Sequence, residues 1–243
     1  MRKNTVDHTV KAFEDELENL TRLIAEMGGL AEKAVADSVL ALGRRDLDLA
    51  GIVVRDDVRL DRLQREVEEA AILLIARRQP VASDLRDVVG ALRICSDLER
   101  IGDLAKNIAK RVIAMGSGVP PQKLVHGVSH ISQIALEQLK HVLDAYTQKD
   151  QGKALGVWKR DEQIDAMYTS IFRELLTYMM EDARNITACT HLLFTAKNIE
   201  RIGDHATNIA ETVYYVSTGE NLSEDRPKGD DSLYTSSIPT AAQ

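Results

Sequence analysis

The chain has 243 residues, of which 44% are hydrophobic and 28% charged, a composition typical of a soluble globular protein. Its formal net charge of −7 argues against nucleic acid as a partner, because binding nucleic acid requires a basic surface. Only 4% of the residues are aromatic and five are prolines, which favours long helices over many short strands.

The chain begins with MRKNTVDHTV, which lacks the apolar core of a signal peptide. The longest apolar run, AAILLIA at 70–76, is too short to span a bilayer, so we predict no membrane span. Prolines mark the joints between helically patterned segments, since proline breaks a helix interior. This pattern predicts six helices at about 8–42, 46–78, 82–115, 122–148, 151–181 and 186–217.

The sequence also predicts the state of the C-terminal segment and of the two cysteines. Residues 219–243 are polar and are expected to form a disordered tail. Cys95 and Cys189 fall within helical patterns and form no CxxC motif. We expect both to be ordinary core thiols in a protein of the reducing cytosol.

An internal repeat organises the helices. ERIGDLAKNIA at 99–109 recurs 101 residues later as ERIGDHATNIA at 200–210, and the residues around the first hairpin recur with an offset of 104. A repeat of this length indicates a duplicated domain. We therefore predict an all-α fold of two tandem antiparallel three-helix bundles, spanning 1–116 and 117–218 and linked by GSGVPP at 116–121.

The hairpin geometry brings carboxylates together in each half. A helix rises 1.5 Å per residue, so a turn near Pro80 places Asp61 level with Glu99, and Asp57 level with Asp103. The second half repeats this arrangement with Asp165 and Glu200, and with Asp161 and Asp204.

Such a gathering is repulsive unless some carboxylates are protonated, Lys or Arg neutralises them, or a metal ion binds them. Carboxylate oxygens suit magnesium, manganese, calcium or iron. The alternative is a solvated acidic helix face. Asn107 and Asn208 follow one turn later and are candidate ligands or supporting donors, whereas Arg100 and Arg201 are expected to balance charge. Gly102 and Gly203 indicate close approach of helices or access of an ion to the backbone.

These motifs carry a family resemblance. The doubled ERIGD with its trailing NIA, the upstream DxxxD pairs, MGGL (27–30), RRQPVASDLR (77–86) and TYMMED (177–182) resemble the PhoU family of phosphate uptake regulators. The resemblance implies one multinuclear metal cluster in each bundle, of iron, zinc, manganese or magnesium. The ligands that it implies are Asp57, Asp61, Glu99, Asp103, Asp161, Asp165, Glu200 and Asp204.

The resemblance also implies a role without catalysis. Members of the family restrain phosphate uptake by the phosphate-specific ABC transporter and keep a partner sensor histidine kinase from activating phosphate-starvation genes. We therefore expect a cytoplasmic homodimer that is held at the inner face of the membrane by its partners, including the transporter's ATPase subunit. Asp84 and Arg86 have no counterpart in the second half, which reads NIT at 185–187, so they are the first candidates for partner contact.

Two other classes of protein stay open. A ferritin-like di-metal oxidoreductase would use Glu-x-x-His pairs on its helices, and none of the six histidines has Glu three residues before it. A metal-free helical scaffold would use the carboxylates only to tune helix pairing. Metal analysis separates the scaffold from the other two classes, and an oxygen-consumption assay separates the oxidoreductase.

Overall fold

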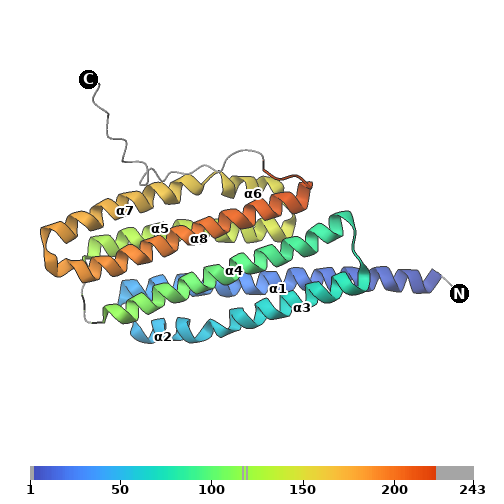
Figure 1. Cartoon of the computed structure of the whole chain (residues 1–243), viewed down its shortest axis with the longest axis horizontal. Coiled ribbons are helices and arrows are strands. Elements are labelled where there is room, and N and C mark those ends of the chain that lie inside the picture. Colours follow the sequence, from blue (N-terminus) through green and yellow to red (C-terminus); the bar gives the residue numbers. More distant parts are fainter. Residues whose placement is uncertain (1–2, 117, 119, 223–243) are drawn as a thin grey trace, which may run out of the picture.

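The computed structural model describes residues 3–116, 118 and 120–222, and within these residues it contains helices and no β-strand (Figure 1). Most of the predicted tail, residues 223–243, lies outside the described part of the chain. The elements are α1 (Lys3–Arg44), α2 (Leu47–Asp56), α3 (Val58–Arg78), α4 (Ala82–Met115), α5 (Gln122–Gln148), α6 (Gln151–Trp158), α7 (Asp161–Glu181), a short 3₁₀ turn η1 (Ala183–Asn185) and α8 (Ile186–Thr218).

The predicted fold class is confirmed. The first half packs α1, the consecutive pair α2 and α3, and α4 against one another, and the second half does the same with α5, the pair α6 and α7, and α8. In Figure 1 the two halves lie one above the other with their helices roughly aligned, and α4 and α8 are neighbours along the boundary. The duplication in the sequence is therefore a duplication of the bundle.

Two of the six predicted helices are interrupted, and the interruptions are equivalent. The helix predicted at 46–78 breaks at Asp57, and the helix predicted at 151–181 breaks at Lys159 and Arg160. At the first break the carbonyl of Asp57 accepts the amide of Leu60 at 2.9 Å, a bond over three residues that tightens the turn. The prediction of six continuous helices is wrong at these points. Asp57, a predicted site residue, lies at the first break, and Asp161, its counterpart, directly follows the second.

The apolar core runs through both bundles. One apolar face of α4 is fully buried, and each of its side chains is at most 4% exposed: Ile94, Leu98, Ile101, Ala105, Ile108 and Val112. α4 and α8 make the most extensive contact of any two elements, and α1 also packs on α5. The buried residues consequently form one continuous cluster across the two halves.

Close approach of α4 and α8 depends on a glycine. A Cβ atom built on Gly90 would collide with the Cγ2 methyl of Val216 on α8. Valine is β-branched and cannot easily turn that methyl away. By contrast, a Cβ on Gly29 of α1 would meet nothing within 4 Å.

We predict that Gly90→Ala destabilises the protein and that Gly29→Ala stabilises it. Overpacking costs about 1–3 kcal/mol, whereas removing a helical glycine gains up to about 1 kcal/mol. Unfolding in urea, followed by circular dichroism, should therefore separate the two variants by about 2 kcal/mol. Equal stabilities would mean that α4 and α8 can accommodate a methyl group at position 90 without a clash.

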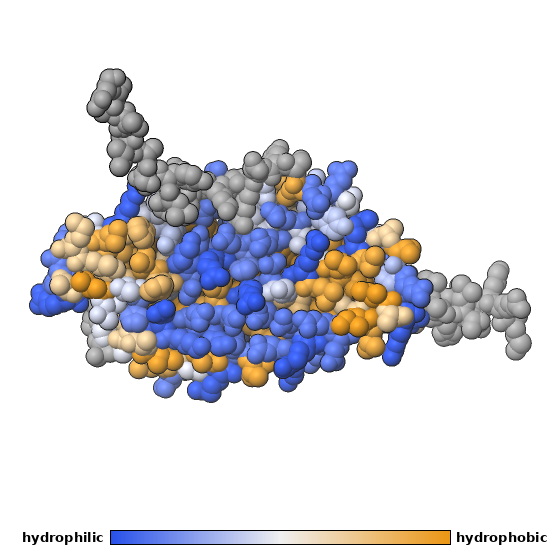
Figure 2. All heavy atoms as spheres, in the orientation of Figure 1, coloured by the Kyte–Doolittle hydropathy of each residue, from blue (hydrophilic) through white to orange (hydrophobic). Residues whose placement is uncertain are grey.

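Apolar side chains are also exposed at the hairpin ends of both halves. Ile72 and Leu85 are 62% and 39% exposed beside the α3–α4 turn, and their counterparts in the repeat, Leu176 and Ile186, are 40% and 47% exposed. Figure 2 shows apolar atoms gathered near both ends of the long axis. None of the described helices has an apolar stretch long enough to cross a lipid bilayer.

Candidate functional site

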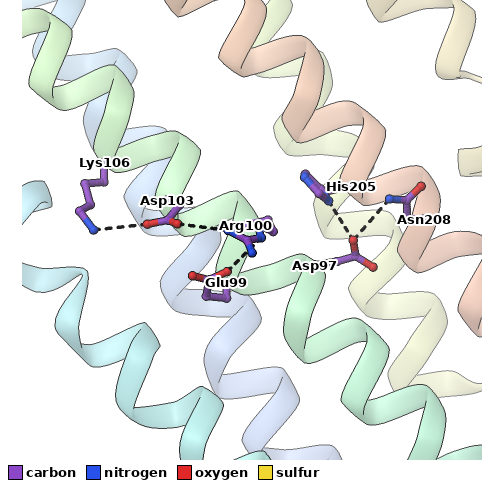
Figure 3. Close-up of polar contacts among 7 residues, drawn as sticks. All are labelled: Asp97, Glu99, Arg100, Asp103, Lys106, His205 and Asn208. Carbon is purple, nitrogen blue, oxygen red and sulfur yellow. Dashed lines mark hydrogen bonds and ion pairs between the residues drawn. The ribbon is translucent and has the colours of Figure 1, made fainter.

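The carboxylates of the first half, Asp57, Asp61, Glu99 and Asp103, form what we call the first cluster. Asp57 lies at the break between α2 and α3, and its side chain is only 8% exposed. The Nζ atom of Lys106 lies 2.5 Å from Oδ2 of Asp57 and 3.3 Å from Oδ1 of Asp103 (Figure 3 shows the second contact). One ammonium group therefore joins carboxylates from two different elements.

The other members of the first cluster affect the pKa of Glu99. Burial raises the pKa of Glu99, and the charges of Asp103 and Asp61 raise it further, while Arg100 lowers it. The guanidinium of Arg100 lies 3.5 Å from Glu99 and 3.8 Å from Asp103, but its side chain is 60% exposed. The electrostatic neighbours are those that the hairpin geometry predicts, because Asp61 acts on Glu99 and Asp57 shares its lysine with Asp103.

The equivalent residues Asp161, Asp165, Glu200 and Asp204 form the second cluster, which is more deeply buried. The first three are 2%, 5% and 6% exposed. The Oγ1 atom of Thr207 donates a hydrogen bond of 2.9 Å to Asp161. The structure thus places a neutral donor on the aspartate that corresponds to Asp57.

The pKa of Glu200 in the second cluster is raised above its ordinary value. Burial raises its pKa, and the charges of Asp204 and Asp165 add to this effect, whereas the ammonium of Lys197 opposes it. Lys197 donates to Oε1 of Glu200 at 2.8 Å. The other oxygen, Oε2, is buried and has no hydrogen-bond partner among the described residues. A buried carboxylate oxygen without a donor is costly and is suited to accept a cation.

The side chains as they stand do not close around an ion. Within the described residues, no three His, Cys, Asp or Glu side chains converge tightly enough to hold a metal. The donor type suits a hard or borderline cation, but lysines occupy part of the space between the carboxylates. Metal binding by the eight predicted residues stays a prediction.

Close approach of the helices explains the glycines of the repeated motif. A Cβ on Gly102 would lie 2.5 Å from Cδ1 of Leu60, and a Cβ on Gly203 would lie 2.7 Å from Cδ1 of Ile164. Leu60 and Ile164 are equivalent in the repeat. These glycines therefore let α3 and α7 approach the helices that carry Glu99 and Glu200.

The sequence did not predict a third polar group, which joins the two bundles. Asp97 of α4 contacts Nδ1 of His205 on α8 at 2.8 Å and accepts a weak hydrogen bond from Asn208 at 3.4 Å (Figure 3). Asn107, the counterpart of Asn208, is exposed. The roles of these two asparagines as ligands or supporting donors stay predictions.

Asp84 and Arg86 lie in the first turns of α4. The guanidinium of Arg86 packs against Gly219, just beyond the last turn of α8, where a cation is favourable. Its Nε atom is buried and lacks a hydrogen-bond partner within the described residues. Asp84 is half-buried, and Leu85 between them is exposed. Their role in partner contact stays a prediction.

Comparison with known proteins gives one consistent result. The family model described as the PhoU domain matches residues 24–112 and 128–213. A "Phosphate-specific transport system accessory protein PhoU homolog" of Rhizobium meliloti is 62% identical over 224 residues, covering 92% of this chain and 94% of the relative. The protein of the same name from Caulobacter vibrioides is 54% identical and covers 92% and 97% of the two chains.

Solved structures agree. The crystal structure of PhoU from Pseudomonas aeruginosa matches with a TM-score of 0.83 at 39% identity, covering 86% of this chain and all of that one. The regulatory protein PhoU from Streptococcus pneumoniae matches with a TM-score of 0.79 at 30% identity, covering 86% and 99% of the two chains. These relatives are named as accessory or regulatory proteins and not as enzymes. With a domain model matched twice and relatives similar over nearly the whole length, the chain belongs to the PhoU family.

Proposed function

We propose that the protein is a cytoplasmic regulator of phosphate homeostasis. It would restrain uptake by the phosphate-specific ABC transporter and, when phosphate is plentiful, hold a sensor histidine kinase in the state that keeps phosphate-starvation genes off. The observation that carries this proposal is 62% identity, over 92% of the chain, to a relative named as an accessory protein of a phosphate-specific transport system.

The regulator would act by docking. The exposed apolar residues at the two hairpin ends provide surfaces for protein contact. At one of these ends, Val81 precedes the asymmetric pair Asp84 and Arg86, and Leu85 lies between them. A homodimer would present these surfaces twice. We place the first contact with the transporter's ATPase subunit or the kinase at the Asp84–Arg86 end, because the second half has no equivalent of this pair.

The carboxylate clusters would support docking indirectly, as structural sites that hold neighbouring helices together. A metal ion of iron, zinc, manganese or magnesium bound between α3 and α4, or between α7 and α8, would fix the spacing of two helices whose ends form the docking surfaces. Such an ion would contribute stability and a defined surface shape.

Deletion of the gene tests the regulator. In a host grown with excess phosphate, deletion should switch on the phosphate-starvation genes, and the wild-type gene should silence them again. A reporter fused to a starvation promoter measures expression of the starvation genes. The rate of labelled-phosphate uptake measures the effect on the transporter. Unchanged uptake and an unchanged reporter after deletion would reject the proposal.

Point variants then locate the docking surface. Asp84→Asn combined with Arg86→Gln should leave the melting curve and metal content close to wild type but fail to silence the reporter. Thr187→Ala, at the exposed position that corresponds to Arg86 in the second half, is the matched control and should silence normally. Silencing by both variants would move the docking surface elsewhere.

A further inference from the structure

A cavity of about 300 Å³ lies between the two bundles, at the end of the molecule where α4 begins and α8 ends (Figure 1). Residues of α1, α4 and α8 line it, together with the end of α5. Its apolar wall consists of Leu17 and Leu20 of α1 and of Val213 and Val216 of α8. The volume is at the lower end of the range for small-molecule sites, so a ligand of this cavity has to be small.

The duplication gives the cavity a counterpart, near the end of α4 and the start of α5. α1 corresponds to α5 with an offset of 104, and α4 corresponds to α8 with an offset of 101. The apolar wall is similar at both ends, since Leu20 and Val213 correspond to Leu124 and Val112. The residues with hydroxyl groups differ: Thr21, Tyr146, Thr147 and Ser217 correspond to Val125, Leu42, Gly43 and Gly116. Hydroxyl groups therefore surround the cavity at one end of the molecule only.

These hydroxyl groups act mainly as acceptors. Thr21, Thr147 and Ser217 each donate the hydroxyl proton to a main-chain carbonyl three or four residues earlier, at 2.8–3.1 Å. A hydroxyl has one proton to donate and two lone pairs, so each of these oxygens can still accept a hydrogen bond. Burial raises the pKa of Tyr146 to about 12, so its phenol is neutral at pH 7. The uncharged part of the wall thus favours a ligand that donates hydrogen bonds.

The charged part of the wall favours a cation. It consists of Glu18, Asp87 and Lys149, so carboxylates outnumber ammonium groups. The Nζ atom of Lys149, at the end of α5, lies 2.7 Å from Oδ2 of Asp87 on α4. The Lys149 side chain is 65% exposed, and an ion pair so open to water contributes little stability. An incoming ammonium group can therefore displace Lys149 from Asp87 at small cost.

We propose that this cavity binds a small organic cation, an aliphatic amine whose ammonium group takes the place of the Lys149 ammonium on Asp87. The hydrocarbon stem lies against the apolar wall, and the hydroxyl oxygens accept the other protons of the ammonium group. An anion of the same size would meet two carboxylates and a set of acceptors. The site is separate from the carboxylate clusters and requires neither the metal ions nor the partners proposed above.

Hexylamine is a suitable probe, because it is protonated at pH 7 and its stem has six carbons. Its binding to the full-length protein is followed by ligand-observed nuclear magnetic resonance. Hexylamine should bind about tenfold more tightly than hexan-1-ol, which has the same stem without the charge. The same difference is expected from hexanoate, which has the opposite charge, and from ammonium chloride, which has the charge without the stem.

Variants locate the ammonium group. Asp87→Asn should weaken binding of hexylamine about tenfold, because the ligand loses its charged acceptor. Thr21→Val, which introduces the residue found at the equivalent position 125, should weaken it about threefold through the loss of one acceptor. Lys149→Asn should instead strengthen binding about threefold, because the competing ammonium group is gone. Asparagine tolerates the left-handed backbone of residue 149, where φ is 51°.

Controls separate a local effect from a change in net charge or in folding. Lys153→Asn removes the same charge from an exposed position four residues further along the chain and should bind hexylamine like wild type. Circular dichroism melting of each variant shows whether it is folded at the titration temperature.

Three results would overturn the proposal. They are equal binding of hexylamine by wild type and Asp87→Asn, binding of hexanoate as tight as that of hexylamine, and binding to Lys149→Asn no tighter than to Lys153→Asn. Each measurement uses purified protein without a transporter, a kinase or a metal ion. Failure of this inference therefore leaves the proposed function intact, and the gene-deletion phenotype tests the regulator in either case.

Discussion

Lys106→Met should lower the free energy of unfolding of the metal-free protein by about 1–3 kcal/mol, the usual cost of leaving a buried polar group without its partner. Methionine fills a similar volume but cannot donate a hydrogen bond, so the Asp57 side chain, which is 8% exposed, would lose the ammonium group that lies 2.5 Å away. Urea unfolding followed by circular dichroism measures the loss. Lys110→Met, at an exposed site on the same helix, should stay within about 0.5 kcal/mol of wild type.

Two further measurements make this prediction specific. Adding Asp57→Asn to Lys106→Met should recover much of the loss, because the unpaired charge is then gone. The hydrogen bond and charge of Asp57, with those of Asp103, raise the pKa of Lys106 in the folded protein. The stabilisation by Lys106 is therefore complete below its unfolded pKa of about 10.4 and is lost as the pH rises through the higher folded value. A loss below about 1 kcal/mol at pH 7 would contradict the ion-pair argument.

Cys95 in the native protein should react with a disulfide reagent at pH 8 about a thousandfold more slowly than an exposed thiol. Burial, with smaller contributions from the charges of Glu68 and Glu99, raises the pKa of the Cys95 thiol to about 12. The reactive thiolate falls about tenfold for each pKa unit above its ordinary value of 9.0. The side chain is also only 1% exposed, so the reagent must wait for local opening.

The measurement is straightforward in a Cys189→Ala background, which leaves one thiol. The colour released by the reagent should appear slowly in buffer and within the mixing time in concentrated urea. Cys189 itself is buried, and burial raises its pKa as well, so Cys95→Ala protein should also react slowly. Rapid labelling of folded Cys95 would show that α4 opens far more often than its packing implies.

The fold was predictable because periodicity, proline positions and the repeat agreed. The two helix breaks were not, since neither lies at a proline and the apolar pattern continues through both. The break at Asp57 is a tightened turn inside an otherwise helical path, with the residue itself in the helical region at φ −53° and ψ −35°. The spacing of apolar residues in the sequence hardly differs with or without such a local turn, so it did not reveal the break.

The level of each carboxylate along its helix was predictable from the sequence, but the lysines that pair with the carboxylates were not. Helical rise alone puts Asp61 beside Glu99, but which lysine reaches between two helices depends on rotation and side-chain conformation. Comparison of Lys106 with Thr207 in the aligned repeat could have indicated that the two carboxylate clusters have different hydrogen-bond donors. The contact of Asp97 with His205 had no such signal, because the sequence of each half carries no information on how the two bundles dock.

The continuous contact of α4 with α8 bears on the origin of the chain. A protein with one repeat would leave the shared face of its last helix uncovered, and could bury it only by pairing with a second copy, at a concentration-dependent cost. Fusion through a short connecting peptide makes that pairing intramolecular, with an effective concentration in the millimolar range. It also frees each copy of the motif to mutate alone. Lysine at 106 with threonine at 207 is a combination that an assembly of identical subunits could never hold.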